Sequence, residues 1–137
     1  FYHLDTCFAP LSDGFLLYYP SAFDAASLEQ IESFYPPHKR ISVSEEDACR
    51  FACNAIDIDR NIVLNQISRE LTARLETAGF RVLQLPLDEF LKAGGAAKCL
   101  VMKLSTPVRA SSPALPHPSS SRDLSSGEIA IPRSSPR

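Results

Sequence analysis

The chain has 137 residues, of which 45% are hydrophobic, so it is long enough for one domain with a modest core. Its formal net charge of −2 gives no basic footprint for nucleic acid or for an anionic membrane surface. No apolar run approaches the length of a membrane span, and the N-terminus shows no signal-peptide pattern. We therefore expect a cytoplasmic protein with neither nucleic acid nor a membrane as its partner.

The first half of the chain predicts a strand–strand–helix–strand unit. Apolar alternation indicates the strands, Asp24 and Ser44 are typical helix N-caps, and the pair Pro36-Pro37 ends the first helix. The expected elements are, in order, a strand at 2–8, a turn at 10–14, a strand at 15–19, a helix from Asp24 to about Tyr35, a strand at 41–43 and a short helix from Ser44 to Phe51.

The second half predicts the same unit again. Leu71, Leu75 and Ala78 fall on one helical face, and Gly79 is typical of a helix C-terminus. The expected elements are a hairpin with strands at 55–58 and 62–65, a helix at 68–78, a strand at 80–85, a helical turn at 87–92 and a last strand at 99–104. The fold class is therefore α/β (α+β), with about two ββαβ modules.

The composition changes after Leu104. Residues 105–137 hold ten serines and six prolines, without Phe or Tyr, so they offer too little apolar surface to offset the entropy of ordering. We expect one domain at 1–104 and a disordered Ser/Pro-rich tail at 105–137. A dispensable linker is the favoured role of this tail, with phosphorylation or docking at its Ser-Pro and Arg-Ser pairs as the alternative. Because the chain begins at Phe1 without methionine, we also expect a truncated start.

Four cysteines are an even number, but the chain is neither short nor secreted in character, so a disulfide framework is not indicated. Cys7, Cys49 and Cys53 are interpreted as plain buried thiols. The three histidines show no ligand spacing, and no metal or other cofactor is expected.

The segment LKAGGAAKCL at 91–100 contains the strongest candidate for chemistry. Gly94 and Gly95 precede Cys99, and paired glycines allow unusual backbone conformations and the close approach of a ligand. A thiolate at Cys99 is a candidate nucleophile, and the neighbouring Lys98 favours the charged form. The alternative is a buried cysteine at a strand start, with the glycines serving only the turn.

Two stretches carry a family resemblance, YHLDTCF at 2–8 and LDEFLKAGGAAKCL at 87–100. Together they resemble the C-terminal half of the guanidine-modifying (pentein) superfamily, which includes arginine deiminases, dimethylargininases, arginine dihydrolases and amidinotransferases. YYPSAFD at 18–24 and FACNA at 51–55 are similar to its dimethylargininase and arginine dihydrolase branch. The resemblance implies part of an α/β propeller of five modules, of which this chain supplies two.

The resemblance also implies roles. Cys99 would attack the guanidinium carbon of arginine or methylated arginine to give a covalent thiouronium intermediate. His3 would protonate the leaving group and then activate water, tasks that suit an imidazole because its pKa lies near neutrality. Substrate-binding roles fall on Asp5, Asn54, Gly94 and Gly95.

The residues themselves support some of these roles and leave others open. Asp5 and His3 project to one face of the expected strand, where a carboxylate can accept bidentate hydrogen bonds from a guanidinium. Asn54 follows a helix and opens the hairpin, where its amide either contacts substrate or satisfies a turn. A structural or surface role for His3 and a solvated strand end for Asp5 are the alternatives. A second carboxylate is expected from earlier modules, so this chain alone should be inactive.

Three functions remain open at this stage. The leading one is a fragment of a hydrolase that acts on guanidinium C–N bonds. An amidinotransferase shares the same cysteine and histidine chemistry, and a catalytically incomplete pentein-like module would bind a partner through its sheet edges. The sequence upstream of Phe1 would discriminate between enzyme and module, and the oligomeric state, including a homo-oligomer, is left open.

Overall fold

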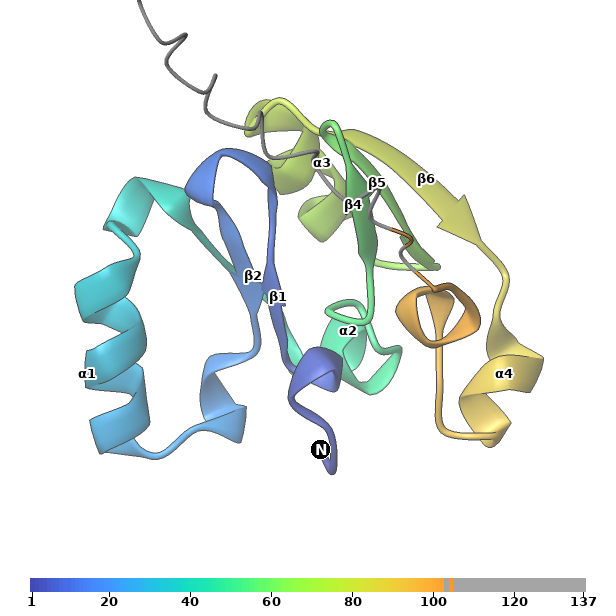
Figure 1. Ribbon diagram of the computed structural model, residues 1–137, viewed down its shortest axis with the longest axis horizontal. Helices are drawn as coiled ribbons and strands as arrows, with labels where there is room; N and C mark the ends of the chain where they lie inside the picture. Colours follow the sequence, from blue (N-terminus) through green and yellow to red (C-terminus); the bar gives the residue numbers. More distant parts are fainter. Residues whose placement is uncertain (103, 105–137) are drawn as a thin grey trace, which may run out of the picture. The chain divides into compact units, whose positions relative to one another are not determined.

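The computed structural model describes residues 1–102 and 104, whose strands form two three-stranded sheets (Figure 1). Residues Phe1–Leu104 make one compact unit. The tail expected at 105–137 lies outside the described residues. Within the part of the chain that is described, no helix is long and apolar enough to cross a membrane.

The first sheet has the order β1-β2-β3, and its strands are β1 (Phe8–Pro10), β2 (Leu16–Tyr18) and β3 (Arg40–Ser42). β2 pairs with β1 in the antiparallel sense and with β3 in the parallel sense. The parallel pair requires a crossover, and α1 (Ala25–Phe34) provides it. Asp24 caps this helix as predicted, because its side chain accepts a hydrogen bond from the Ser27 amide at 2.7 Å. That hydrogen bond lowers the pKa of the Asp24 carboxyl.

The second sheet repeats this topology in the order β4-β5-β6. Its strands are β4 (Ile56–Ile58), β5 (Asn61–Asn65) and β6 (Arg81–Leu85), with an antiparallel first pair and a parallel second pair. The crossover helix is α3 (Arg69–Thr77), and Gly79 follows it with φ +90°, in the left-handed region that favours glycine. The expected repeat of two ββαβ modules is confirmed.

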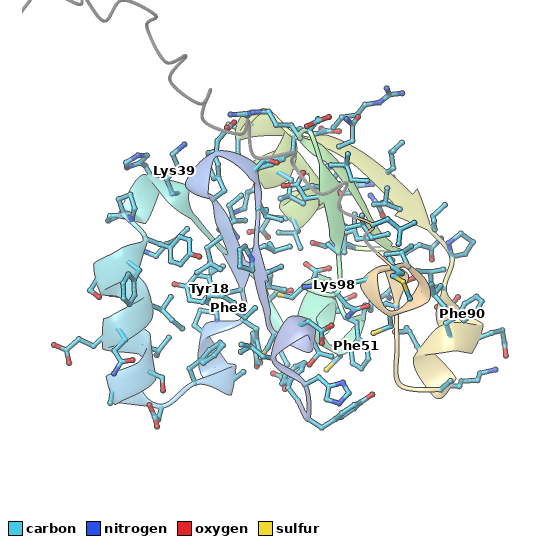
Figure 2. The ribbon with its side chains drawn as sticks, in the orientation of Figure 1. Phe8, Tyr18, Lys39, Phe51, Phe90 and Lys98 are labelled. Atoms are coloured by element: carbon cyan, nitrogen blue, oxygen red, sulfur yellow. The ribbon has the colours of Figure 1, made fainter. Side chains whose placement is uncertain are left out.

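One hydrophobic core joins the two modules. It contains Leu17 and Ile41 of the first sheet, Ile62 and Leu64 of the second, and residues of α3 such as Leu75. α1 contributes less to this core than α3 does, since none of the residues of α1 is fully buried. Figure 2 shows Phe8 and Tyr18 in the space between the first sheet and α1.

A buried carboxylate fastens one module to the next. Asp47 lies on α2 (Glu45–Cys49), which follows β3, and is only 2% exposed. It accepts hydrogen bonds from the Ser68 amide at 2.7 Å, from the Ser68 hydroxyl at 2.7 Å and from the Ser44 hydroxyl at 3.1 Å. Ser44 and Ser68 are the N-caps of α2 and α3, so this carboxylate fixes the starts of both helices.

Two expected strands are wrong. The segment 2–8 contains a 3-10 turn, η1 (Leu4–Thr6), because the Thr6 amide and hydroxyl both bond to the His3 carbonyl, at 3.1 and 2.6 Å. The segment 99–104 contains the end of another, η5 (Ala97–Leu100), which packs beside β5 (Figure 1). The apolar residues after η5 stay exposed, Met102 by 83%, so burial does not hold them in a strand.

The interpretation of the cysteines needs one correction. All four are free; Cys7 and Cys53 are buried as expected, but Cys49 is exposed near the end of α2. Because α2 is short, Ala48 and Asp47 take its buried face and Cys49 turns outward.

Candidate active site

The side chain of Asn54 brings together two of the residues that the sequence marks for chemistry. Its Nδ2 lies 3.2 Å from Asp5 Oδ2 and 3.2 Å from Cys99 Sγ, and it donates to both. Its Oδ1 accepts from the backbone amides of Ala96 at 3.1 Å and Cys99 at 3.3 Å. Asn54 itself is 0% exposed, whereas Asp5 is half-buried and Cys99 is exposed. The Cys99 side chain therefore stays accessible to solvent, while the backbone of the turn that carries it is held by the buried Asn54 amide.

The paired glycines shape the approach to this thiol. Gly94 has φ +84°, and a Cβ built there would collide with the Tyr2 hydroxyl. At Gly95 a Cβ would lie 3.0 Å from Cys99 Cβ and 3.4 Å from its sulfur. The second glycine thus leaves room for the Cys99 side chain, and the first allows the turn.

His3 does not lie on a strand, and its geometry differs from the expected one. It precedes η1 as an exposed residue, so it and Asp5 are not related by strand alternation. The neighbouring Tyr2 ring packs edge-on against the imidazole, with centroids 4.7 Å apart. The Tyr2 hydroxyl donates to the Gly94 carbonyl, so the N-terminal segment that carries His3 is fastened to the glycine turn that precedes Cys99.

A hollow of about 560 Å³ opens beside Asp5 and Lys98. It is also lined by Asp57 of β4, and one oxygen of each carboxylate, Asp5 Oδ1 and Asp57 Oδ1, is buried with no hydrogen-bond partner among the described residues. The other Asp57 oxygen accepts from the Ser12 amide. Buried unpaired carboxylate oxygens are costly, and a bound cation with several N–H donors would satisfy them.

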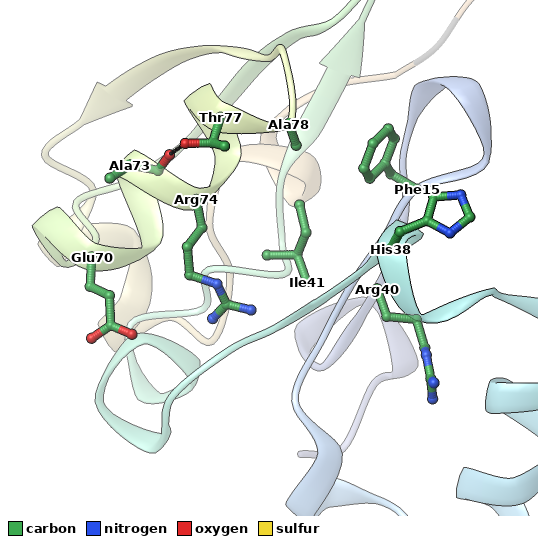
Figure 3. Close-up of a pocket in the computed structure, with 9 residues that line it drawn as sticks. All are labelled: Phe15, His38, Arg40, Ile41, Glu70, Ala73, Arg74, Thr77 and Ala78. Carbon is green, nitrogen blue, oxygen red and sulfur yellow. Dashed lines mark hydrogen bonds between the residues drawn. The ribbon is translucent and has the colours of Figure 1, made fainter.

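A larger hollow of about 610 Å³ lies elsewhere and contains none of the expected site residues (Figure 3). Figure 3 shows Arg74 of α3 and Arg40 of β3 among its lining residues, with the Arg40 guanidinium pointing away from the others. Both guanidinium groups already have partners, since Arg40 pairs with Glu32 at 2.7 Å and Arg74 donates to the Ser42 carbonyl at 2.7 Å. The size of this hollow therefore does not make it the better candidate for chemistry.

Sequence reasoning missed two residues that lie near the candidate site around Asp5 and Cys99. Asp57 stands between Ile56 and Ile58 in an otherwise apolar strand, and an acidic residue there is a signal for a partner or a ligand. Tyr2 carries no such signal, because its bond to Gly94 depends on the fold. Within the described residues, no three His, Cys, Asp or Glu side chains gather where they could hold a metal ion.

The two ββαβ modules, each with an antiparallel and a parallel strand pair, fit the expected part of an α/β propeller. No protein-family model matches the chain. It is 58% identical over 108 residues to the bifunctional arginine dihydrolase/ornithine cyclodeaminase ArgZ of Synechocystis, a match that covers 79% of this chain and 15% of ArgZ. It is 39% identical over 104 residues to the dimethylarginine dimethylaminohydrolase of Mycobacterium tuberculosis, covering 76% of this chain and 34% of that enzyme.

A solved structure agrees with these relatives. The crystal structure of the N-terminal domain of an ArgZ variant, covalently bound to a reaction intermediate, superposes with a TM-score of 0.71 at 61% identity, over 72% of this chain and 36% of that one. The chain is thus homologous to a part of these enzymes of the guanidine-modifying (pentein) superfamily and shares the fold of that part. It spans 15% of the length of ArgZ and 34% of that of the dimethylargininase.

Proposed function

We propose that this chain carries the nucleophile portion of a hydrolase that cleaves guanidinium C–N bonds of arginine or methylated arginine. The observation that carries the proposal is the meeting of the Cys99 sulfur and the Asp5 carboxylate at one buried amide. A guanidinium that bonds to Asp5 would have its central carbon near the thiol, as nucleophilic attack requires. The homologues named above, which hydrolyse guanidino groups, support the same chemistry.

In the proposed reaction the Cys99 thiolate attacks the guanidinium carbon, and a C–S bond forms. His3 gives a proton to the leaving nitrogen, the C–N bond breaks, and ammonia or an amine departs. His3 then takes a proton from water, the water oxygen attacks the thiouronium carbon, and the C–S bond breaks to restore the thiolate. The covalent intermediate in the ArgZ structure supports this two-stage course.

The remaining expected residues have supporting parts in the proposal. Asp5, which lines the hollow described above, binds the guanidinium through its carboxylate. Gly95 leaves room for the Cys99 side chain, and Gly94 allows the turn before it. Parts of the pocket beyond this chain would supply a second carboxylate, and the chain alone should then be inactive. A cytoplasmic location and a homo-oligomer stay predictions.

Replacing Cys99 by serine in the full-length gene product tests the nucleophile. A hydroxyl is far harder to ionise than a thiol, so release of ammonia, amine, citrulline or ornithine from arginine and methylarginines should fall by about 10³-fold or more. Cys49→Ser is the matched control, because Cys49 is the other exposed thiol and should leave turnover unchanged. Undiminished turnover by the Cys99→Ser protein would refute the assignment.

Replacing His3 by alanine tests the second stage. Without the imidazole, the thiouronium intermediate should form slowly and its hydrolysis should stop, so the adduct should persist on Cys99. Mass spectrometry of the protein incubated with arginine would locate that added mass. A His3→Ala enzyme that turns over without accumulating the adduct would show that His3 is not the general acid and base.

A further inference from the structure

The amide of Asn54 has no exposed surface and no unused hydrogen-bonding group. A primary amide offers two N–H donors and one oxygen with two lone pairs. The two donors go to Asp5 Oδ2 and Cys99 Sγ, each at 3.2 Å. The oxygen accepts from the amides of Ala96 and Cys99, at 3.1 and 3.3 Å. A substrate could contact this side chain only by displacing one of these bonds.

The surrounding backbone fixes which way the amide faces. Backbone N–H groups cannot donate to an NH₂ group, so the oxygen must face Ala96 and Cys99. The nitrogen is then left facing the carboxylate and the sulfur. The Lys98 amide also donates to the Asn54 carbonyl, at 3.2 Å. Asn54 therefore holds the turn that carries Cys99 through three backbone donors as well as through the sulfur.

We propose that Asn54 is a positioning residue that orients the Cys99 thiolate and the Asp5 carboxylate toward one another, and that it does not contact the substrate. The inference rests on the proposed function and deepens it. An N–H donated to an ionised sulfur or oxygen is stronger than one donated to a neutral group, so the amide also stabilises the charged forms that the reaction needs. One side chain thereby sets the distance between the nucleophile and the group that receives the guanidinium.

A merely structural role for Asn54 is the competing explanation, and the chain offers a matched control for it. Asn65 is also a buried asparagine, 1% exposed, in the same module. Its amide donates to the Arg50 carbonyl at 3.0 Å and accepts from the Leu87 amide at 3.0 Å. Both of these partners are backbone groups, so a change at Asn65 removes a buried amide without removing a contact to the sulfur.

The test compares Asn54→Ala, Asn54→Asp and Asn65→Ala in the full-length gene product. The measured quantity is the rate at which iodoacetamide alkylates Cys99 at a series of pH values, read peptide by peptide by mass spectrometry. Loss of an N–H to a charged acceptor should raise the pH of half-maximal alkylation by roughly one unit or more. The Asn54→Asp change, which puts a negative group beside the sulfur, should raise it further. Cys49 is exposed on α2 and serves as the internal reference.

For Asn65→Ala we expect a lower melting temperature but an unchanged alkylation profile at Cys99. Equal profiles for the Asn54→Ala and Asn65→Ala proteins would overturn the proposal, as would a profile that does not move in either Asn54 variant. In the unsubstituted protein, the side-chain amide NMR signals of Asn54 should shift as Cys99 ionises, and those of Asn65 should not. Static Asn54 signals would overturn the proposal even if the Asn54 variants failed to fold.

The alkylation measurement needs no substrate, so it separates this inference from the proposed function. If the Cys99→Ser enzyme kept its turnover while alkylation of Cys99 still depended on Asn54, only the hydrolase assignment would fail. If Cys99→Ser abolished turnover but the alkylation profile of Cys99 were the same in the Asn54 variants as in the unsubstituted protein, only the positioning role would fail.

Discussion

The four thiols of this chain occupy two kinds of environment, although the sequence gives them the same residue type. Burial raises the pKa of the Cys7 thiol and raises the pKa of the Cys53 thiol further, to well above the ordinary value of 9.0. Cys49 and Cys99 are exposed. A buried neutral thiol is a poor nucleophile, so the environment separates inert cysteines from reactive ones.

Those raised pKa values predict a loss of stability in alkali. The folded protein keeps the Cys53 proton above pH 9, whereas the unfolded chain releases it there. The stabilisation is therefore fully present below about pH 9 and is lost as the pH rises above that value. Urea denaturation between pH 8 and 10.5 should show the decline, and Cys53→Ala should flatten it. An equal decline in the Cys53→Ala protein would assign the effect to other groups.

Among the elements, the starts of the helices were the most predictable from sequence and the two ends of the described unit the least. Asp24, Ser44 and Ser68 cap the three helices that follow them, since capping depends on residues three positions apart. The segments 2–8 and 99–104 depend on distant partners, such as the Asn54 amide that binds the turn around Cys99. Apolar alternation within a segment carries no information about such partners.

The same dependence limits how much of the candidate site could be predicted. Resemblance assigned Cys99 and Asp5 to one site, and in the structure each accepts a hydrogen bond from the Asn54 amide. Whether the Asn54 amide contacts substrate or satisfies a turn stayed open in the sequence, because its burial and its bond to Asp5 arise only when the two ends of the unit meet. Asp57 was passed over for the same reason.

A substitution of Asp47 tests how strongly the two modules are joined. Asp47→Ala leaves the amide and hydroxyl of the half-buried Ser68 without their acceptor, and an unsatisfied buried group costs about 1–3 kcal/mol. Urea denaturation should report a loss of that order in the free energy of unfolding. Glu45→Ala, on the exposed face of the same helix, is the control and should change it by less than about 0.5 kcal/mol. Equal losses of stability in the Asp47→Ala and Glu45→Ala proteins would show that Asp47 does not join the two modules.

On the scale of the whole unit, the core belongs to both modules together. The rings of Phe15 and Phe80, one from each module, meet edge to face with centroids 5.3 Å apart and an interplanar angle of 81°. Both residues are buried, and both belong to the single cluster that includes strands of each sheet. Neither module therefore has a complete apolar core of its own.

A double-mutant cycle at these two rings measures that sharing. Phe15→Leu and Phe80→Leu should be non-additive in the free energy of unfolding by about 0.5–1.5 kcal/mol, the contribution of an edge-to-face pair beyond its buried area. Phe15→Leu combined with Phe90→Leu is the control, because Phe90 is exposed on α4 (Asp88–Lys92). The control pair should be additive within about 0.5 kcal/mol. Additivity at Phe15 and Phe80 would mean that the modules fold on separate cores.

The hydrogen bonds that link Asp5, Asn54 and Cys99 also affect the order in which the chain folds. They link η1 to η5, which lie at opposite ends of the described residues, and contacts of such long sequence separation are slow to form because of their loop-closure entropy. On the ribosome the thiol is synthesised after both of its partners and meets them when the strands between are already made. During refolding, the pH dependence of Cys99 alkylation should therefore reach its native form only in the slowest phase.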